Sequence, residues 1–573
     1  MEGSTMIGKS GSVQARFRKI REDKRMKALV FVAVILLLMA PKIVTFMNQA
    51  NDAFVYSSIA IAQASCEQNR LIIGPFKLPP SLPGATGPPA GSPFSWQSHA
   101  DGISERVLVT SFLVTFSRVT GLTLREMLFL PVGGIVIVLL AYALGKALSK
   151  SSIVALFYAL FVSYALNNTN SISYVPLGFA THYLFLIVLI KVMDFRTDIR
   201  KSIVMLSIIF FVSNLTYYSA EAFNMFAIAS ISLLVILAGK KAFRIRFKQH
   251  WLPSFALLSL AFLIIFVAFE REVPIYLERA SFSRFLDTLA EYITYVFNVF
   301  SRNVGQIQQF RSAAANVVSI YLDAVTKVLI VIATATYALT YAMSSLRKSK
   351  FIELEVEFAV FISLVIISIL ELAIYWSYGP AGGFRYVYWF ISLLAFYSLS
   401  KLGTKLRRKR IFAIISLALV LTVIVRFAIM WQDPVDSHDG RQLYIQMTSS
   451  STWVIQNVDH GRLLSDLHIS ARLFAEAAFY SKADRIYPYE FYNDIDMLYE
   501  FNQTRVESIF NKRGYEYLVL SSSFRSKAVM GDVWAGSGPP LGGALSYFDN
   551  YTSFNKIYDD SRGLVYQFQI AGS

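Results

Sequence analysis

The sequence predicts a polytopic α-helical membrane protein, with about eleven membrane-spanning helices and a C-terminal α/β domain outside the membrane. Three observations predict this class. The 573 residues are 55% hydrophobic and 16% charged, whereas soluble chains carry about a quarter charged residues. Apolar runs near the length of about 20 residues that crosses a bilayer recur along most of the chain. After Trp431 the composition turns polar.

A basic tail, residues 1–27, precedes the first apolar run. That run could be a signal peptide, but no small-residue cleavage site follows it cleanly, so we expect it to remain as an anchor. The membrane domain then extends over residues 28–431. Spans are expected at 28–47, 126–148, 153–167, 179–194, 202–220, 222–238, 251–269, 322–343, 356–376, 385–400 and 411–431.

The formal net charge of +16 would fit a nucleic-acid partner if the basic residues were gathered in one domain. They instead fall in short clusters between apolar runs, which is typical of cytoplasmic loops and predicts no nucleic-acid partner. With the N-terminus in the cytoplasm, this alternation places the C-terminal domain, residues 432–573, on the external side of the membrane. We therefore expect a multi-pass protein of the cell membrane. The clusters lie at 9–27, 191–201, 240–248, 347–350 and 401–410.

One further apolar stretch, residues 103–121, decides the topology. It contains Glu105, Arg106 and Arg118, which are costly in lipid. A span here would move every later basic loop to the outside. We therefore expect an external helix that lies on the membrane or dips into it.

Two large external loops are expected, at about 48–125 and 270–321. The first contains the stretch PFKLPPSLPGATGPPAGSP, which excludes a helix or a central strand there. In the C-terminal domain, alternating apolar residues predict strands at 462–465, 517–521 and 564–568. A helix is expected at about 468–481, between the first two strands.

Two charged residues at the external membrane surface are the main candidates for chemistry. Asp52 directly follows the first span, in the segment NDAFVYSSIAIAQAS; a cap on the short helix that follows would also explain it. Arg385 begins a late span after GPAGG. A guanidinium there could bind the anionic phosphate of a lipid carrier through two hydrogen bonds, or it could anchor the span at the lipid headgroups.

A divalent metal is a weaker hypothesis. His99 and Asp101, in SHAD, could coordinate a metal together with Asp52, although two such residues at this spacing often occur by chance. The chain has one cysteine, Cys66, so an internal disulfide and a cysteine-based metal site are excluded.

Four further acids are secondary candidates. An acid inside or beside a span is a functional hypothesis by default, although a hydrogen bond between helices or simple exposure would also explain it. They are Glu221 in an external turn, Glu371 inside a span, and Glu270 and Glu272 at the start of the second loop.

Several short motifs follow one another along the chain. Asp52 follows the first span, and the Pro/Gly-rich loop comes next. The further motifs are VTFSRVTG at 114–121, VLLAYALGKAL at 138–148, GFRYVYWFISLLAFYSL at 383–399, and YLVLSSSF with the closing hairpin FNKIYDDSRGLVYQF at 554–568. In this order they resemble the GT-C class of membrane glycosyltransferases, which includes protein mannosyltransferases, aminoarabinose transferases and oligosaccharyltransferases. The resemblance covers nearly the whole chain in architecture.

The resemblance implies a polyprenyl-phosphate-linked sugar as donor and a glycan, lipid or protein as acceptor. It assigns the role of catalytic base or metal ligand to Asp52. Arg385, with Tyr386, would bind the donor phosphate. The chain departs from the class where Ala53 replaces a second acid, where 167–174 has no carboxylate, and where WSYG at 376–379 lacks the Asp of the oligosaccharyltransferase signature. The missing carboxylate at 167–174 favours a monosaccharide transferase.

Two other functions compete with this hypothesis. A transporter usually has charges at mid-membrane and detectable internal repeats. Here the charges cluster at the ends of the spans and no repeat is visible. A non-catalytic assembly factor, which would use the external domain for binding, would tolerate Asp52→Ala.

Overall fold

The apolar runs of the sequence form a bundle of helices in a computed structural model. Each helix of the bundle overlaps a predicted span, and the run at 251–269 lies outside the described residues. The structure describes residues 32–41, 59, 61–63, 65–67, 107–127, 130–165, 174–193, 199–216, 224, 227–228, 243–245, 317–348, 352–354, 365, 392–402, 409–432, 441–465, 467–480, 482, 485–490, 503–521, 548–560 and 563–569.

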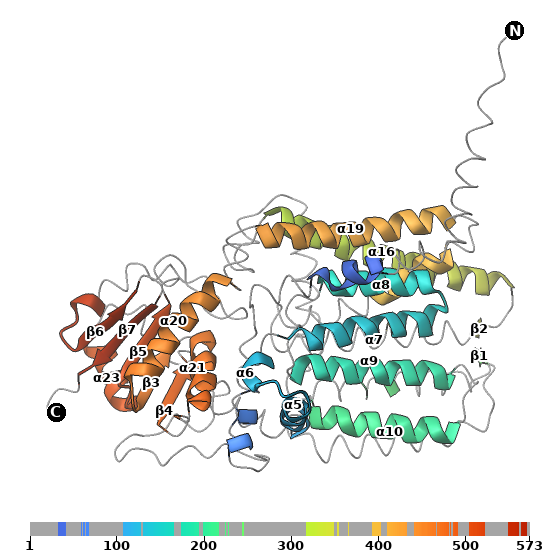
Figure 1. Ribbon diagram of the computed structural model, residues 1–573. Helices are drawn as coiled ribbons and strands as arrows, with labels where there is room; N and C mark the ends of the chain where they lie inside the picture. Colours follow the sequence, from blue (N-terminus) through green and yellow to red (C-terminus); the bar gives the residue numbers. More distant parts are fainter. Residues whose placement is uncertain are drawn as a thin grey trace, which may run out of the picture.

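Neighbouring helices of the bundle lie side by side (Figure 1). Short connections join consecutive helices, so that α7, α8, α9 and α10 alternate in direction. A helix at 32–41 and another at 392–402 complete the described part. The labelled helices are α7 (Val132–Ser149), α8 (Ser152–Ala165), α9 (Tyr174–Met193), α10 (Ile199–Thr216), α16 (Val317–Lys348) and α19 (Lys409–Gln432).

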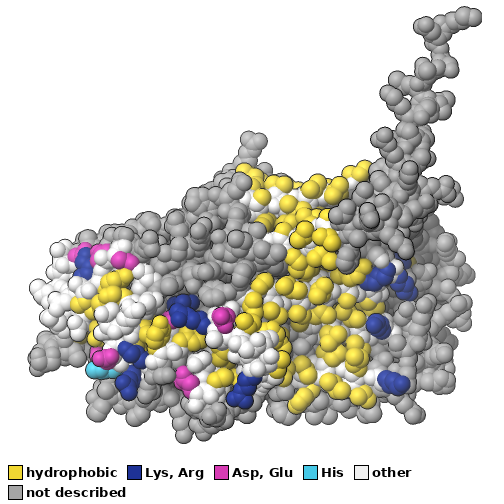
Figure 2. Space-filling view, in the orientation of Figure 1, with side chains coloured by type: hydrophobic (Ala, Val, Ile, Leu, Met, Phe, Trp, Pro, Cys, Tyr) yellow, Lys and Arg dark blue, Asp and Glu magenta, His cyan; other side chains and the backbone are white. Residues whose placement is uncertain are grey.

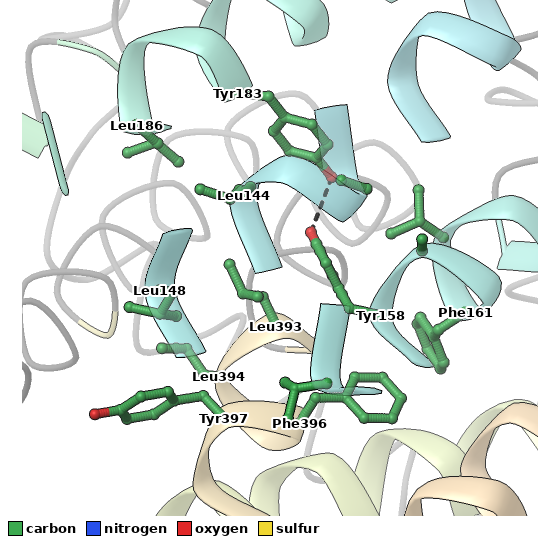
Figure 3. Close-up of a cluster of buried hydrophobic side chains, with 14 of the residues drawn as sticks. Leu144, Leu148, Tyr158, Phe161, Tyr183, Leu186, Leu393, Leu394, Phe396 and Tyr397 are labelled. Carbon is green, nitrogen blue, oxygen red and sulfur yellow. Dashed lines mark hydrogen bonds between the residues drawn. The ribbon is translucent and has the colours of Figure 1, made fainter. Parts of the chain in front are cut away.

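The bundle is apolar both inside and outside. Its core is packed with large side chains such as Leu144, Phe161 and Phe396, and the hydroxyls of Tyr158 and Tyr183 are hydrogen-bonded within it at 3.0 Å (Figure 3). The outer surface is also apolar (Figure 2), with side chains 58% exposed at Leu139 and Ile208. A surface of this extent is unfavourable in water and is typical of contact with lipid.

Two helices of the described part are long and apolar enough to cross a membrane, Val132–Ser149 and Ala324–Ser344. Six shorter apolar helices accompany them; the number of about eleven spans stays a prediction. The shorter helices are Val32–Pro41, Leu108–Thr120, Ser152–Ala165, Leu177–Lys191, Val204–Ser213 and Ile414–Ile429.

The helix ends that contain Lys146, Lys191 and Lys201 lie at the end of the bundle that faces away from the C-terminal domain (Figure 1). Lys146 lies in the last turn of α7, where the left-handed residue Lys150 (φ 57°) ends the helix. Lys191 lies in the last turn of α9, and Lys201 in the first turn of α10. At the same end, two basic loops pair through parallel strands β1 (Phe243–Ile245) and β2 (Ile352–Leu354).

Helix α5 (Val107–Thr120) lies across the opposite end of the bundle. Figure 1 views it end-on, while α7 to α10 lie along the page, and it contacts α10. Helix α5 therefore lies crosswise to these helices and not alongside them as a further span would. Its location on the external face stays a prediction.

A short helix, α6 (Leu124–Met127), connects α5 to α7. Thr123 and Glu126 form a capping box at its start. The Thr123 backbone N–H donates to Glu126 Oε2 at 2.7 Å, and the Glu126 N–H donates to Thr123 Oγ1 at 3.2 Å. These reciprocal bonds hold a helix of only four residues in place.

The C-terminal domain is built on a sheet of strand order β4-β3-β5-β7-β6. The strands expected at 462–465, 517–521 and 564–568 correspond to β3, β5 and β7, and the closing hairpin to β6 and β7. Strands β4, β3 and β5 are parallel, whereas β5, β7 and β6 are antiparallel. The strands are β3 (Gly461–Ser465), β4 (Ile486–Glu490), β5 (Tyr517–Ser521), β6 (Phe554–Asp559) and β7 (Gly563–Phe568).

Helices cover both faces of this sheet. Helices α20 (Arg441–Asn457) and α21 (Leu467–Phe479) pack on the face of Val519 and Val565. Helix α23 (Gln503–Arg513) packs on the face of Leu518. The helix expected at 468–481 is α21.

Candidate active site

Every residue to which the sequence analysis assigned a chemical role lies outside the described residues. Their roles therefore stay predictions. What the structure describes is the end of the bundle that meets the C-terminal domain. The residues are Asp52, His99, Asp101, Glu221, Glu270, Glu272, Glu371, Arg385 and Tyr386.

The span that precedes Asp52 is held by the last turn of α8. The Ser163 hydroxyl donates to the carbonyl of Leu38, and the Tyr164 hydroxyl donates to the carbonyl of Leu37 at 3.2 Å. Inside a bundle, such bonds satisfy hydroxyls that would otherwise lack a partner in lipid. The first span is thus fixed against α8 near the end of α8 that faces the C-terminal domain.

The first loop is described at 59, 61–63 and 65–67, and these residues, which begin seven residues after Asp52, are helical. Ile59, Ile61 and Ala62 are fully buried, and the Ser65 hydroxyl donates to the Ile61 carbonyl at 2.8 Å. In Figure 1 these helical pieces lie between α5 and the C-terminal domain. The loop is therefore packed between the two parts of the molecule.

One apolar cluster, which we call the junction cluster, joins three parts of the chain. It contains residues of the first loop, of α5 and α6, and of the C-terminal domain, with Cys66 packed partly buried against it. Its members include Ile59, Ala62, Val109, Leu113, Leu124, Met127, Val454, Ile455, Val458, Ile469, Leu473 and Ala477.

A group of charges crosses the same junction. Arg125 of α6 lies 3.5 Å from a carboxylate oxygen of Glu476 on α21, and its guanidinium carbon lies 5.9 Å from the centre of the Phe479 ring. Glu476 also pairs with Arg472, one turn earlier on α21. The side chains of Glu476 and Arg472 are 1% and 3% exposed, and that of Arg125 is 48% exposed.

A buried polar group inside the bundle was missed by the sequence analysis. His182 Nδ1 lies 2.7 Å from Asn224 Oδ1, and Asn224 Nδ2 donates to Ser213 Oγ at 2.9 Å. All three side chains are fully buried. The available signal was an ionisable residue inside the span predicted at 179–194, which is rare in membrane helices and often functional.

The metal site expected at Asp52, His99 and Asp101 stays a prediction. Within the described ranges, no group of three or more His, Cys, Asp or Glu side chains could hold a metal ion. The predicted ligands Asp52, His99 and Asp101 lie outside those ranges.

Comparison with known proteins identifies the architecture. No family model and no curated protein matches the chain. The oligosaccharyltransferase of Archaeoglobus fulgidus, solved with a tethered acceptor peptide containing the NVT sequon, aligns with 94% of this chain and 74% of its own, at 14% identity and a TM-score of 0.50. The chain has a GT-C-like fold.

Two other solved structures align over a similar length. The same oligosaccharyltransferase with zinc and sulfate covers 93% of this chain and 73% of its own, at 13% identity and a TM-score of 0.46. ArnT from Cupriavidus metallidurans bound to undecaprenyl phosphate covers 94% and 98%, at 12% identity and a TM-score of 0.43. At such identities the likeness concerns the fold.

Proposed function

We propose that this GT-C-like protein is a glycosyltransferase of the cell membrane, which transfers a sugar from a polyprenyl-phosphate donor to an acceptor on the external face. The observation that carries the proposal is the GT-C-like fold, aligned over 94% of the chain. The first loop, which contains Asp52, is packed between the bundle and the C-terminal domain in its described part. Such an arrangement suits a covered site at the membrane surface.

The position of the basic residues supports the orientation. Lys146, Lys150, Lys191 and Lys201 belong to helix ends that face away from the C-terminal domain. Basic loops remain in the cytoplasm. The C-terminal domain and the first loop would then both be external.

The proposed reaction is an inverting displacement. Asp52 takes the proton of an acceptor hydroxyl, whose oxygen attacks the anomeric carbon as general-base catalysis requires. The bond from that carbon to the phosphate oxygen breaks, and the electron pair leaves with the lipid phosphate. Arg385 stabilises the leaving phosphate by charge, and Tyr386 adds a hydrogen bond.

The chain lacks a carboxylate that bears on the size of the transferred unit. The tethered peptide of the Archaeoglobus fulgidus enzyme is the acceptor of that protein. Because 167–174 has no carboxylate here, we favour transfer of a single hexosyl or pentosyl unit. Glu221, Glu270 and Glu272 are secondary candidates for contact with the acceptor, and a divalent metal on Asp52, His99 and Asp101 is the less favoured alternative.

The test is turnover of a panel of polyprenyl-phosphate sugars by the purified protein. Asp52→Asn should lower kcat by about 100-fold or more, with the donor KM little changed, because only the proton transfer is lost. Arg385→Ala should raise the donor KM and lower kcat. Asp459→Asn, a change on the exposed surface of the C-terminal domain, is the control for Asp52→Asn and should be neutral.

Normal activity of both site variants would refute the assignment of the site. Equal function of wild type and Asp52→Ala in cells would favour an assembly factor. Movement of a substrate across vesicle membranes without any transfer of sugar would favour a transporter.

A further inference from the structure

We propose that Arg125 is a positioning residue, which clamps the first external loop against the C-terminal domain through Glu476. This inference rests on the proposed function, because it assigns the clamp a role in holding the loop that contains Asp52. In this proposal the C-terminal domain helps to position the active site.

Glu476 is a buried carboxylate that lies between two arginines. A carboxylate that is 1% exposed is costly unless cations and hydrogen bonds compensate for its lost hydration. Arg472 supplies one cation from the same helix. The second cation, Arg125, comes from α6, which lies far away in the sequence, so this ion pair forms only when the C-terminal domain is docked.

Arg125 lies on a short helix that contacts the first loop. Its neighbours Leu124 and Met127 are buried in the junction cluster together with Ile59 and Ala62 of the first loop. The capping box of Thr123 and Glu126 fixes the start of α6. A shift of α6 therefore moves the apolar contacts of the first loop, and a misplacement of about 1 Å can cost about 100-fold in rate.

Because Arg125 is partly exposed, it can be substituted without leaving a buried charge unpaired. Its role in docking can therefore be tested without unfolding the C-terminal domain. Removal of Glu476 would leave Arg472 buried without its carboxylate, so this change could unfold the domain. Removal of Arg125 leaves the pair of Arg472 and Glu476 intact within α21. Arg125→Ala is therefore the variant that tests docking.

The chain contains its own reporter. Cys66 is the single cysteine, and it is partly buried against the junction cluster in the first-loop helix. Undocking should expose it. We would measure the rate of maleimide labelling in the full-length protein in detergent, with Cys66→Ser to identify the signal.

Arg125→Ala should raise the labelling rate by about three- to tenfold, the effect of losing one half-exposed charged contact. Arg125→Lys should restore most of the wild-type rate, because it keeps the charge. Arg118→Ala removes an exposed arginine of the neighbouring helix α5 and should label like wild type. With a donor that is turned over, Arg125→Ala should lower kcat by about tenfold and leave the donor KM unchanged.

An unchanged labelling rate in Arg125→Ala would overturn the clamp. Faster labelling with normal kcat would overturn its role in positioning. If wild type turns over no donor, the proposed function fails, whereas the labelling rates still decide whether Arg125 docks the loop.

Discussion

Nδ1 of His182 lies 2.7 Å from Oδ1 of Asn224. We infer from the neighbouring bonds that the ring nitrogen is the donor. Ser213 donates its single hydroxyl proton to the Ile209 carbonyl at 2.8 Å, so its oxygen must accept from the Asn224 amide nitrogen at 2.9 Å. The amide oxygen of Asn224 is then directed at His182, and an oxygen requires a donor. The chain links α9 and α10 to the helical residue Asn224.

The first prediction concerns this hydrogen bond. His182→Leu and Asn224→Leu should each lower the free energy of unfolding by about 1–3 kcal/mol, because each leaves a buried polar partner without its bond. The double variant should cost clearly less than the sum of both. Thermal unfolding in detergent measures the three values, and strict additivity would show that the pair is not coupled.

The second prediction concerns topology. In a Cys66→Ser background, Asp459→Cys on the C-terminal domain should react with a membrane-impermeant maleimide on intact cells. Lys150→Cys, at the end of α7, should react only after permeabilisation, because basic loops are cytoplasmic. The opposite pattern would reverse the orientation and remove the proposed site from the external face.

The third prediction concerns the contact between β7 and α20. A Cβ atom at Gly563 would lie 1.7 Å from the Ser450 hydroxyl oxygen. Gly563→Ala should therefore destabilise the C-terminal domain by about 1–3 kcal/mol, as overpacking does. Adding Ser450→Ala should recover part of the loss, since the nearest atom is removed. Proteolysis at increasing urea concentration measures both, and an unchanged midpoint for Gly563→Ala would contradict the close packing.

The fourth prediction concerns pH. The backbone N–H and then the hydroxyl of Thr123 donate to Glu126 and hold the pKa of this carboxyl below its ordinary value of 4.5. A depressed pKa stabilises the fold above the ordinary value, and the contribution is lost as the pH falls through the folded-state pKa. Wild type should therefore unfold at a higher temperature than Glu126→Gln at pH 7. The difference should shrink as the pH falls below 4.5, and a difference that did not change with pH would exclude the carboxylate as the cause.

The helices of the bundle could be predicted because their composition is local information. Runs such as 126–148 and 411–431 overlap α7 and α19, and the charges of 103–121 predicted no span there. In the C-terminal domain, apolar alternation predicted β3, β5 and β7. Strand β4 was not predicted because Pro488 interrupts it; the proline is tolerated there because β4 is at the edge of the sheet.

The arrangement of Tyr558 shows what pattern alone could not predict. A register shift between Lys556 and Tyr558 in β6 reverses the alternation, so Phe554 packs toward α23 while Tyr558 packs toward α20. There its ring stacks on Trp453 at 4.9 Å. Simple alternation would have placed Phe554 and Tyr558 on the same face.

The sequence by itself determined which segments prefer lipid, which end of each helix is basic, and where the polar domain begins. These properties depend on the free energy of transfer of each residue between water and hydrocarbon, so they can be read from the local composition of the chain. Only the tertiary structure decided that Arg125 meets Glu476, that His182 meets Asn224, and that the first loop packs against a distant domain. Such pairings depend on how whole surfaces fit together, and local composition contains no record of that.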